Sequence, residues 1–340
     1  MARKVNIRDV AAEAGVSVTT VSHVLNHFSG ARVSEETRQR VEASAERLGY
    51  AANGLARGLR LQRSQTLGLL SDEIATTPHA GRIILGAQET ASARGWVLIL
   101  LTTGKDRQAE QREIRALTQH RVDGVLYATM YHREVVVPQQ LRVMPVVLLD
   151  VSSRDETIPS VVPDEVGGGR AAVRHLLEHG HRSIGFVTNV DDIPATHGRL
   201  RGYRAALEEA GIGYRPDLVV AAATDARGGF RAASALLDRA DRPTALFCFN
   251  DRLAMGAYRA AAELGLRVPA DLSIIGFDNQ ELIAESLYPG LTTMALPHYE
   301  MGAWAVSTMI DMVEGKSTED ARRITMPCPL IVRESVSGPG

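Results

Sequence analysis

The sequence predicts two parts, a small all-helical module at the N-terminus and a larger α/β body of two lobes. The first 60 of the 340 residues follow a helical pattern with almost no alternation of β-branched residues. From Thr66 onward, short apolar runs alternate with helical segments, which is typical of parallel sheets covered by helices on both faces. The body has roughly ten such strands, which is more than a single sheet usually contains. We therefore expect two lobes with a cleft between them, with a single large sheet as the alternative.

Charge is distributed unevenly between these parts. The whole chain has a net charge of −2, but its first 60 residues carry 9 Lys or Arg against 6 Asp or Glu. A basic module on an acidic body is the distribution expected of a chain that meets a polyanion through its N-terminus.

The cysteine content and the hydropathy of the chain indicate where in the cell the protein is expected. The only two cysteines, Cys248 and Cys328, offer no disulfide framework, which is consistent with a reducing cytoplasm. Apolar runs such as WVLILL are too short to cross a bilayer, so we expect a cytoplasmic protein with no membrane partner.

The N-terminal module has helix-turn-helix spacing over residues 7–25. Ala11 allows two helices to approach each other, and Gly15 can adopt the positive φ that a tight turn requires. A third helix is predicted from the N-cap Ser34 to a stop at Gly49. The three helices together can form a small core of their own.

The second of these helices has two different faces. Val21, Val24 and Leu25 share an apolar face, whereas Thr19, Thr20 and His23 share a polar one. Such short, mostly uncharged side chains fit the DNA major groove, and a solvated face is the alternative. The candidate DNA-contacting residues of this helix are Val18, Thr19, Thr20, Ser22 and His23.

Acidic and amide side chains close many of the apolar runs of the body. They are Asp72, Asp150, Asp164, Asn189, Asn250 with Asp251, and Asp278. In open parallel sheets ligands bind outside the carboxyl ends of the strands, so these side chains could line one cleft. Each could also be the N-cap of the next helix, and we expect about half of them to be caps.

Several segments in order resemble one known family. They are VNIRDVAAEAGVSVTTVSHVLN, VSEETRQRVEASAERLGY, NGLARGLR, RHLLEHGHRSIGFV, GRLRGYRAAL and FNDRLAMGAYRAAAELGLRVPADLSIIGFDN. They are similar to the lactose-repressor (LacI/GalR) family of bacterial transcription regulators over nearly the whole chain. The resemblance implies a helix-turn-helix DNA-binding domain followed by an α/β, two-lobed effector domain like that of periplasmic binding proteins, its lobes connected by three crossovers.

The resemblance also implies domain limits. Residues 1–60 would form the DNA-binding domain, with a hinge helix over 53–60, and residues 61–340 the effector-binding and dimerisation domain. Lobe 1 would comprise about 64–163 and 291–321, and lobe 2 about 164–290 and 322–335.

The hinge segment matches the family at three DNA-contacting positions. Leu59 corresponds to the leucine that enters the minor groove, where an apolar side chain unstacks base steps. Arg57 and Arg60 would add phosphate or minor-groove contacts.

The body matches the family's effector site at four positions and departs from it at two. Arg199, Asn250, Asp278 and Asp150 correspond to cleft positions, and a guanidinium, an amide and carboxylates suit a ligand rich in hydroxyls. Where the family often has aromatic residues, this chain has His79 and Thr224. The candidate effector-binding residues are Asp72, His79, Asp150, Arg199, Thr224, Asn250 and Asp278.

The acidic groups of the cleft indicate the charge of the ligand. Asp72, Glu73, Asp150 and Asp278 would repel an anion, so we expect a neutral mono- or disaccharide that releases the operator. A corepressor-dependent regulator with a purine-like ligand is the alternative, because VTTVSHVLN is also close to the recognition helix of purine repressors. A sugar-binding protein of a transport system is a third reading.

Other motifs are absent. No phosphate loop, zinc-protease motif or nucleophile elbow occurs, so we expect no catalytic residue and no cofactor. His175 and His179 in HLLEHGH are better explained by a helix end than by a metal site. The chain ends VSGPG without a leucine heptad, which favours a homodimer over a tetramer assembled through its tails.

Overall fold

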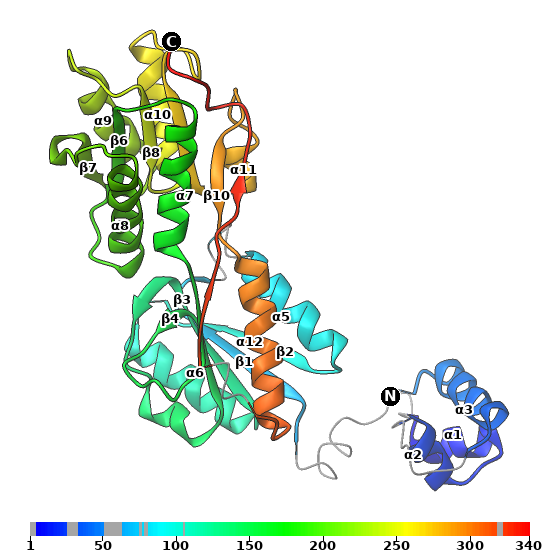
Figure 1. Ribbon diagram of the computed structural model, residues 1–340. Coiled ribbons are helices and arrows are strands. Elements are labelled where there is room, and N and C mark those ends of the chain that lie inside the picture. The colour runs from blue at the N-terminus through cyan, green and yellow to red at the C-terminus, as the bar shows by residue number, and fades with distance from the viewer. Residues whose placement is uncertain are drawn as a thin grey trace. The chain divides into compact units, whose positions relative to one another are not determined.

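The structure is a computed structural model that describes residues 5–25, 33–50, 63–74, 77, 81–104, 106–317 and 322–340 (Figure 1). Contacts divide the chain into two compact units, Met1–Gln65 and Thr66–Gly340. Each unit has its own core and is described separately below.

The first unit contains three helices, α1 (Ile7–Ala14), α2 (Val18–Leu25) and α3 (Glu35–Arg47). A capping box opens α1: the Asn6 side chain accepts from the Arg8 amide, and the Asp9 side chain accepts from the Asn6 amide. This helix ends at Gly15, whose φ of 65° is the left-handed turn expected from the sequence.

A compact apolar core holds the three helices together. Its buried members are Val10, Ala11, Ala14, Val21, Val24, Val41 and Ala45. Arg40 of α3 adds a polar link, because its Nε donates to the carbonyl of Ala14 over 2.9 Å at the C-terminus of α1. The prediction of a helix-turn-helix module is confirmed.

The second unit contains two six-stranded sheets. The first has the order β11-β5-β4-β3-β1-β2, and all its pairings are parallel. Its strands are β1 (Thr66–Ser71), β2 (Val97–Thr102), β3 (Gly124–Glu134), β4 (Val146–Ser152), β5 (Ser160–Pro163) and β11 (Arg323–Met326). We call this sheet lobe 1, together with α5 (Gly81–Ala93), α6 (Arg107–Gln119), α12 (His298–Val313) and the 3₁₀ helix Gln139–Val143.

The second sheet has the order β12-β10-β9-β8-β6-β7, with β12 antiparallel to β10. Its strands are β6 (Ile184–Asn189), β7 (Val219–Ala222), β8 (Ala245–Cys248), β9 (Ser273–Asp278), β10 (Thr292–Ala295) and β12 (Leu330–Ile331). Its helices are α7 (Glu165–Glu178), α8 (Pro194–Glu209), α9 (Ala226–Leu237), α10 (Asp251–Glu263) and α11 (Glu281–Ala284), with the 3₁₀ helix Pro216–Leu218. These elements form lobe 2.

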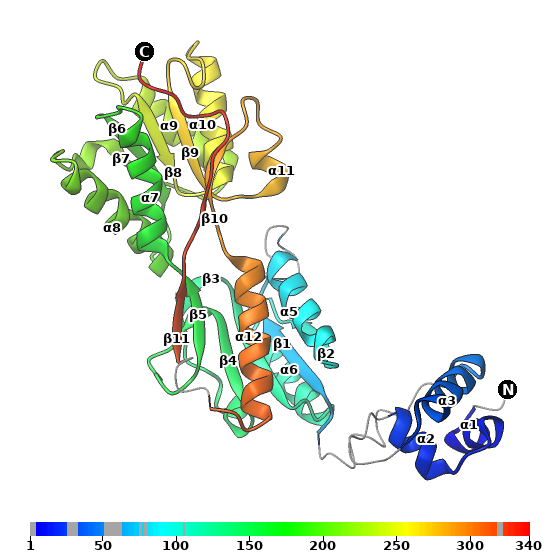
Figure 2. The same ribbon diagram turned by 45° about the vertical axis from the view of Figure 1, so that its right-hand side comes forward.

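The chain passes between the lobes three times: from β5 to α7, from β10 to α12 and from β11 to β12 (Figure 2). The expected ranges need correction at two strands. We expected residues 291–321 in lobe 1, but β10 pairs with β9 in lobe 2. We expected 322–335 in lobe 2, but β11 pairs with β5 in lobe 1. The last two crossovers therefore lie later in the chain than these expected limits, because an isolated four-residue strand carries no mark of its sheet.

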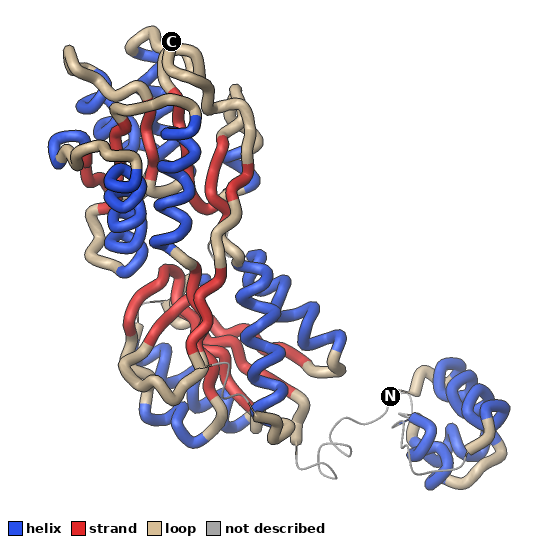
Figure 3. Tube along the Cα trace, viewed as in Figure 1, coloured by secondary structure: helices blue, strands red, loops and turns tan. Residues whose placement is uncertain are grey.

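Helices cover both faces of each sheet (Figure 3). In lobe 1 the neighbouring strand residues Leu69 and Leu70 belong to different buried clusters, one with Met301 of α12 and the other with Ile114 of α6. Strands buried on both faces read as continuous apolar runs, which is the pattern that predicted parallel sheets. The prediction of two α/β lobes is confirmed.

Helices α7 and α8 of lobe 2 pack unusually closely. A Cβ at Gly202 of α8 would collide with the carbonyl oxygen of Val166 on α7, and a Cβ at Gly169 of α7 would lie 2.7 Å from the carbonyl oxygen of Arg199. Glycine at these positions brings the two backbones together. The close approach places Glu165 at the start of α7 beside Arg199.

His175 and His179 of HLLEHGH lie at the C-terminal end of α7. His179 caps α7, its Nδ1 lies 2.8 Å from the carbonyl oxygen of His175, and Gly180 has a φ of 95°. No helix in the described ranges is long and apolar enough to span a bilayer.

Candidate functional site

The predicted DNA-reading face of α2 is accessible at its N-terminal end. Val18 is 40% exposed, and Thr19 is exposed. Thr20, Ser22 and His23 are half-buried, while Val21 and Val24 lie in the core. An apolar side chain and a hydroxyl therefore project from the first turn, as direct contacts to base edges would require.

Thr20 also has a structural role. The Ser17 side chain is the N-cap of α2, since its Oγ accepts from the Thr20 amide over 3.0 Å. The Thr20 hydroxyl lies 2.9 Å from the same Ser17 Oγ. Any base contact by Thr20 would therefore share its hydroxyl with the cap.

Four of the predicted site residues cannot be placed. Arg57, Leu59 and Arg60 of the hinge segment lie outside the described residues, and so does His79.

Four other predicted residues meet at a small chamber where the two lobes face each other. Asp150 comes from β4 of lobe 1, while Arg199, Asn250 and Asp278 come from lobe 2. The chamber has a volume of about 30 Å³. Its full lining is Met130, Tyr131, His132, Asp150, Pro163, Glu165, Ala195, Arg199, Phe249, Asn250, Asp278, Leu296 and His298.

Arg199 is the centre of the chamber and is only 3% exposed. Its Nε donates to Glu165 Oε2 over 2.7 Å, and its Nη1 donates to the carbonyl of Phe249 and, over 3.5 Å, to Asp278 Oδ1. The guanidinium also lies 3.6 Å from the ring centroid of Phe277. Burial lowers the pKa of Arg199, but the Glu165 and Asp278 carboxylates outweigh it and leave the pKa raised.

Asp150 faces this guanidinium from lobe 1, in an environment that disfavours an ionised carboxylate. It is 5% exposed, its φ is 57°, and its Oδ1 has no hydrogen-bond partner. Burial, followed by the nearby Glu165, raises its pKa well above the ordinary value. A buried, unpartnered oxygen on a residue at positive φ is a feature that binding sites retain.

Asp278 is the last residue of β9 and Asn250 follows β8, so both lie at the carboxyl ends of strands, as predicted. Asp278 has a φ of 103°, and its Oδ2 accepts from Gln280 Nε2 over 2.9 Å. Asn250 is the N-cap of α10, since its Oδ1 accepts from the Leu253 amide over 2.8 Å. Asn250 also lines the chamber, so this residue serves both the helix and the site.

The other strand-end residues are structural. Asp164 caps α7 by accepting from the Gly167 amide, and Asn189 accepts from the Asp191 amide in a turn. Asp251 is fully buried and binds the Thr293 hydroxyl and, through Oδ2, the backbone of the segment before α11. Of the seven strand-end residues, Asp164 and Asn250 are N-caps, so the expectation that about half would be caps was too high.

Two predicted effector residues do not line the chamber. Asp72 forms an ion pair with Arg133 and accepts from the Met130 amide over 2.9 Å, which fixes the irregular end of β3. The carbonyl oxygen of Thr224, and not its side chain, accepts from Asn250 Nδ2 over 3.5 Å. Their placement gives neither side chain direct access to the chamber in this arrangement of the lobes.

The lining residues that were missed from sequence include Glu165, His132 and His298. Burial, with Arg199 nearby, lowers the pKa of His132 to about 4, so this side chain is neutral near pH 7. Glu165 could have been found, because it directly follows the strand-end residue Asp164. His132 could not, since it lies at an irregularity of β3 that leaves no mark in the apolar pattern.

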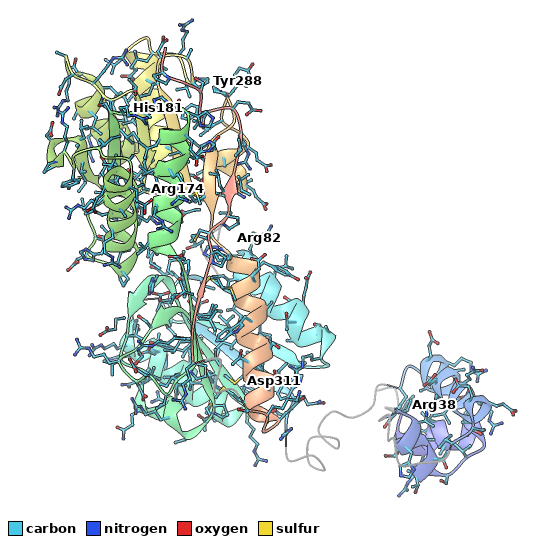
Figure 4. The ribbon with its side chains drawn as sticks, viewed as in Figure 1. Arg38, Arg82, Arg174, His181, Tyr288 and Asp311 are labelled. Atoms are coloured by element: carbon cyan, nitrogen blue, oxygen red, sulfur yellow. The ribbon has the colours of Figure 1, made fainter. Side chains whose placement is uncertain are left out.

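A larger pocket of about 950 Å³ adjoins the chamber and shares Asp278, Leu296 and His298 with it. Its walls include Leu282 of α11 and Pro297 beside α12. At the lobe boundary, Arg82 of α5 pairs with Glu281 of α11 over 2.9 Å, and Figure 4 labels Arg82 there. A ligand of ordinary size would need this space or a slight parting of the lobes, because about 30 Å³ holds roughly one water.

The chamber has the chemistry of a ligand-binding site. Its groups are donors and acceptors suited to hydroxyls, amides and amines. Within the described ranges, no three His, Cys, Asp or Glu side chains are placed to share a metal ion.

Comparisons with known proteins agree with both units. The family model of bacterial regulatory proteins of the lacI family matches residues 6–53. The model of periplasmic binding proteins and the sugar-binding domain of the LacI family matches residues 64–334.

Individual relatives extend this similarity over almost the whole chain. The HTH-type transcriptional repressor PurR of Proteus mirabilis (strain HI4320) is 35% identical over 336 residues, covering 97% of this chain and 96% of the relative. The ribose operon repressor of Haemophilus influenzae is 34% identical over 331 residues, covering 97% and 98%.

A solved structure gives the same result. The lac repressor dimer bound to operator and the anti-inducer ONPF has a TM-score of 0.75 and 27% identity, covering 98% of this chain and 100% of that chain. These relatives are transcriptional repressors and not enzymes. The chain therefore belongs to the LacI family of bacterial regulatory proteins and is a DNA-binding transcriptional repressor.

Proposed function

We propose that this repressor binds a pseudo-palindromic operator as a homodimer and is released when a small polar ligand, most simply a sugar, binds between its lobes. The observation that carries the proposal is the chamber, where Arg199, Asp278 and Asn250 of lobe 2 face Asp150 of lobe 1. A ligand held by both lobes changes the balance between two lobe arrangements, and a few kcal/mol of differential affinity suffices to empty an operator.

The DNA contacts are assigned to two segments. Val18, Thr19, Thr20, Ser22 and His23 of α2 would read the major groove, and Arg57, Leu59 and Arg60 would act in the minor groove. The exposed first turn of α2 supports the first assignment. The second rests on the family resemblance of the hinge sequence. A repressor acts where the DNA is, and we accordingly assign the protein to the cytoplasm.

A sugar is supported by the polar groups that ring the chamber. Hydroxyls can both donate to carboxylates and accept from an arginine or an amide. The Arg199 guanidinium carbon lies 4.2 Å from the centroid of the Phe249 ring. The ring face that the guanidinium covers is therefore unavailable for stacking on a planar base. The ribose operon repressor among the relatives is consistent with a sugar.

A corepressor-dependent regulator with a purine-like ligand is the second candidate. It is favoured by the 35% identity to repressors named PurR and by the recognition helix VTTVSHVLN. The sign of the ligand effect separates the candidates, because an inducer loosens operator binding and a corepressor tightens it.

A homodimer is supported by exposed apolar side chains on both lobes. Leu85 of α5 is 46% exposed, Val97 of β2 is 60% exposed, and Leu282 of α11 is 80% exposed. Tyr288, labelled in Figure 4, is 97% exposed on the loop that follows α11. The β2 strand is also an unpaired sheet edge, which a partner would cover.

One experiment tests the proposal. Operators are selected from a random DNA library with the full chain, and their affinity is measured while sugars and purines are titrated. Release by a sugar supports the proposal, and tightening by a purine would replace it with the second candidate. Failure to enrich any DNA would contradict both.

A further inference from the structure

We propose that the effector of this repressor carries a positive charge, as an amine on a sugar or similar polyol, and that Asp150 receives this charge. The inference rests on the proposed role of the chamber as the effector site. It goes beyond that role by assigning the charge of the ligand and the group that binds it.

The charged groups that line the chamber do not balance. Three carboxyl groups, those of Asp150, Glu165 and Asp278, face one guanidinium, that of Arg199. His132 also lines the space but is neutral near pH 7, because burial lowers its pKa to about 4. Ionisation of all three carboxyls would leave the chamber two negative charges in excess.

The single guanidinium is already committed within lobe 2. Its Nε binds Glu165 over 2.7 Å, and its Nη1 is directed at the Phe249 carbonyl and at Asp278. Arg133 of lobe 1 is likewise paired, with Asp72. Neither arginine forms a hydrogen bond with Asp150, whose buried Oδ1 has no partner in the described structure.

Asp150 is therefore an acceptor prepared for a group from outside the chain. Its 5% exposure keeps bulk water from satisfying the oxygen, and its positive φ shows that the backbone is held in an uncommon conformation to place it there. In the empty chamber burial raises the pKa of Asp150 and so favours protonation, which would remove one of the two excess charges. A bound cation would offset the same single charge by pairing with the ionised carboxylate.

We assign the charge to an organic group. Within the described ranges no three acidic, histidine or cysteine side chains are placed to share a metal ion. An anion would add to the excess, and a neutral polyol would satisfy hydrogen bonds without offsetting the charge. In a site screened from water, this difference between an amine and a hydroxyl is large.

The expectation of a neutral ligand is thereby refined. It counted Asp72, whose charge is neutralised by Arg133, and it did not count Glu165.

Matched ligands test the inference. Thermal shift and titration calorimetry with the full chain compare glucosamine with glucose, galactosamine with galactose, and putrescine with 1,4-butanediol. In at least one pair we expect the amine to bind about tenfold more tightly than its hydroxyl partner. A panel in which no amine stabilises the protein more than its hydroxyl partner overturns the proposal.

The variant Asp150→Asn tests whether Asp150 causes the preference for the amine. This variant keeps the size of the side chain and removes its charge, so we expect it to lose about tenfold in affinity for the amine and little for the hydroxyl partner. Glu263→Gln, which removes a charge from the exposed end of α10, is the control and should bind both ligands as the parent does. Equal losses for both ligands in Asp150→Asn overturn the assignment.

Operator selection with the same preparations separates this inference from the proposed function. If DNA is enriched and a neutral ligand releases it, the proposed function stands and the charge assignment is wrong. If no DNA is enriched while an amine binds through Asp150, the charge assignment stands and the proposed function is wrong.

Discussion

The α2 face and the chamber around Arg199 differ in burial and in charge. The α2 face presents an exposed hydroxyl and an exposed apolar side chain, on a helix whose opposite face forms a core. The chamber holds one arginine and three acids, of which Arg199 is 3% exposed and Asp150 is 5% exposed.

This difference decides what each region can tolerate. Side chains on the exposed face contribute little to folding, so their replacement should change DNA binding alone. Charges in the chamber depend on one another, so the loss of a partner should change both ligand binding and stability. Four predictions test this comparison, beginning with the largest expected effect.

Replacing Arg199 with Met should lower the free energy of unfolding by about 3–5 kcal/mol. The substitution keeps most of the side-chain volume but leaves Glu165 and Asp278 buried without their shared cation. Urea unfolding measures the change. Arg201→Met on the exposed side of the same helix is the matched control, expected within about 0.5 kcal/mol of the parent. A small effect at Arg199 would mean that the chamber is not an interdependent charge cluster.

Replacing Gly202 with Ala should cost about 1–3 kcal/mol, because the new Cβ would collide with the Val166 carbonyl and push α8 from α7. The same displacement should separate Arg199 from Glu165 and weaken effector binding. Calorimetry and urea unfolding measure the two effects. Gly213→Ala, at a site with no atom within 4 Å of the added Cβ, should change neither. Weaker ligand binding without a stability change would contradict the link between helix packing and site geometry.

Asp150→Asn should change the pH dependence of stability. Since the native pKa of Asp150 is raised above its unfolded value, the native state holds a proton that the unfolded state has lost. The stability of the parent therefore falls as pH rises from about 4 toward the native pKa, at up to about 1.4 kcal/mol per pH unit.

The asparagine variant lacks this proton, so its stability relative to the parent should increase with pH over the same range. The lowered pKa of His132 has the opposite sign: stability is lost as pH falls from about 6.5 to about 4. His132 is present in both proteins, so its contribution largely cancels in the difference. Unfolding free energies of both proteins at pH 5 to 8 provide the test. A difference that stays constant would show that Asp150 is ionised in the empty chamber.

Replacing Thr19 with Ala should have the smallest effect on stability, within about 0.5 kcal/mol, because the side chain is exposed. Operator affinity should fall by about 1 kcal/mol, or roughly fivefold, through loss of a base contact. Fluorescence anisotropy with the selected operator measures it, with Gln39→Ala on exposed α3 as the control. Unchanged affinity would remove Thr19 from the reading face.

The sequence predicted most of what local patterns determine. Periodicity located the three N-terminal helices, and Gly15 marked the turn between the first two. Continuous apolar runs predicted parallel sheets, and the residues that close them included Asp150, Asn250 and Asp278. These features depend on a residue and its near neighbours.

The parts that were missed depend on contacts between distant segments. The sheet membership of β10 and β11 is decided by pairing partners far along the chain. Asp72 was assigned to the cleft because it ends a strand, and only the structure shows that Arg133 neutralises it. Glu165 could have been considered because it follows Asp164, but its pairing with Arg199 depends on the glycine-mediated approach of α7 and α8.

The central claim is that ligand binding between the lobes controls DNA binding by the helix-turn-helix unit. Operator affinity, measured by fluorescence anisotropy during titration of an effector found in the ligand screen, tests it most directly in the parent and in Asp278→Asn. We expect the effector to release the parent from the operator and to leave Asp278→Asn bound at the same concentration. Equal release of both proteins, or an effector that binds the parent without changing its operator affinity, would contradict the account.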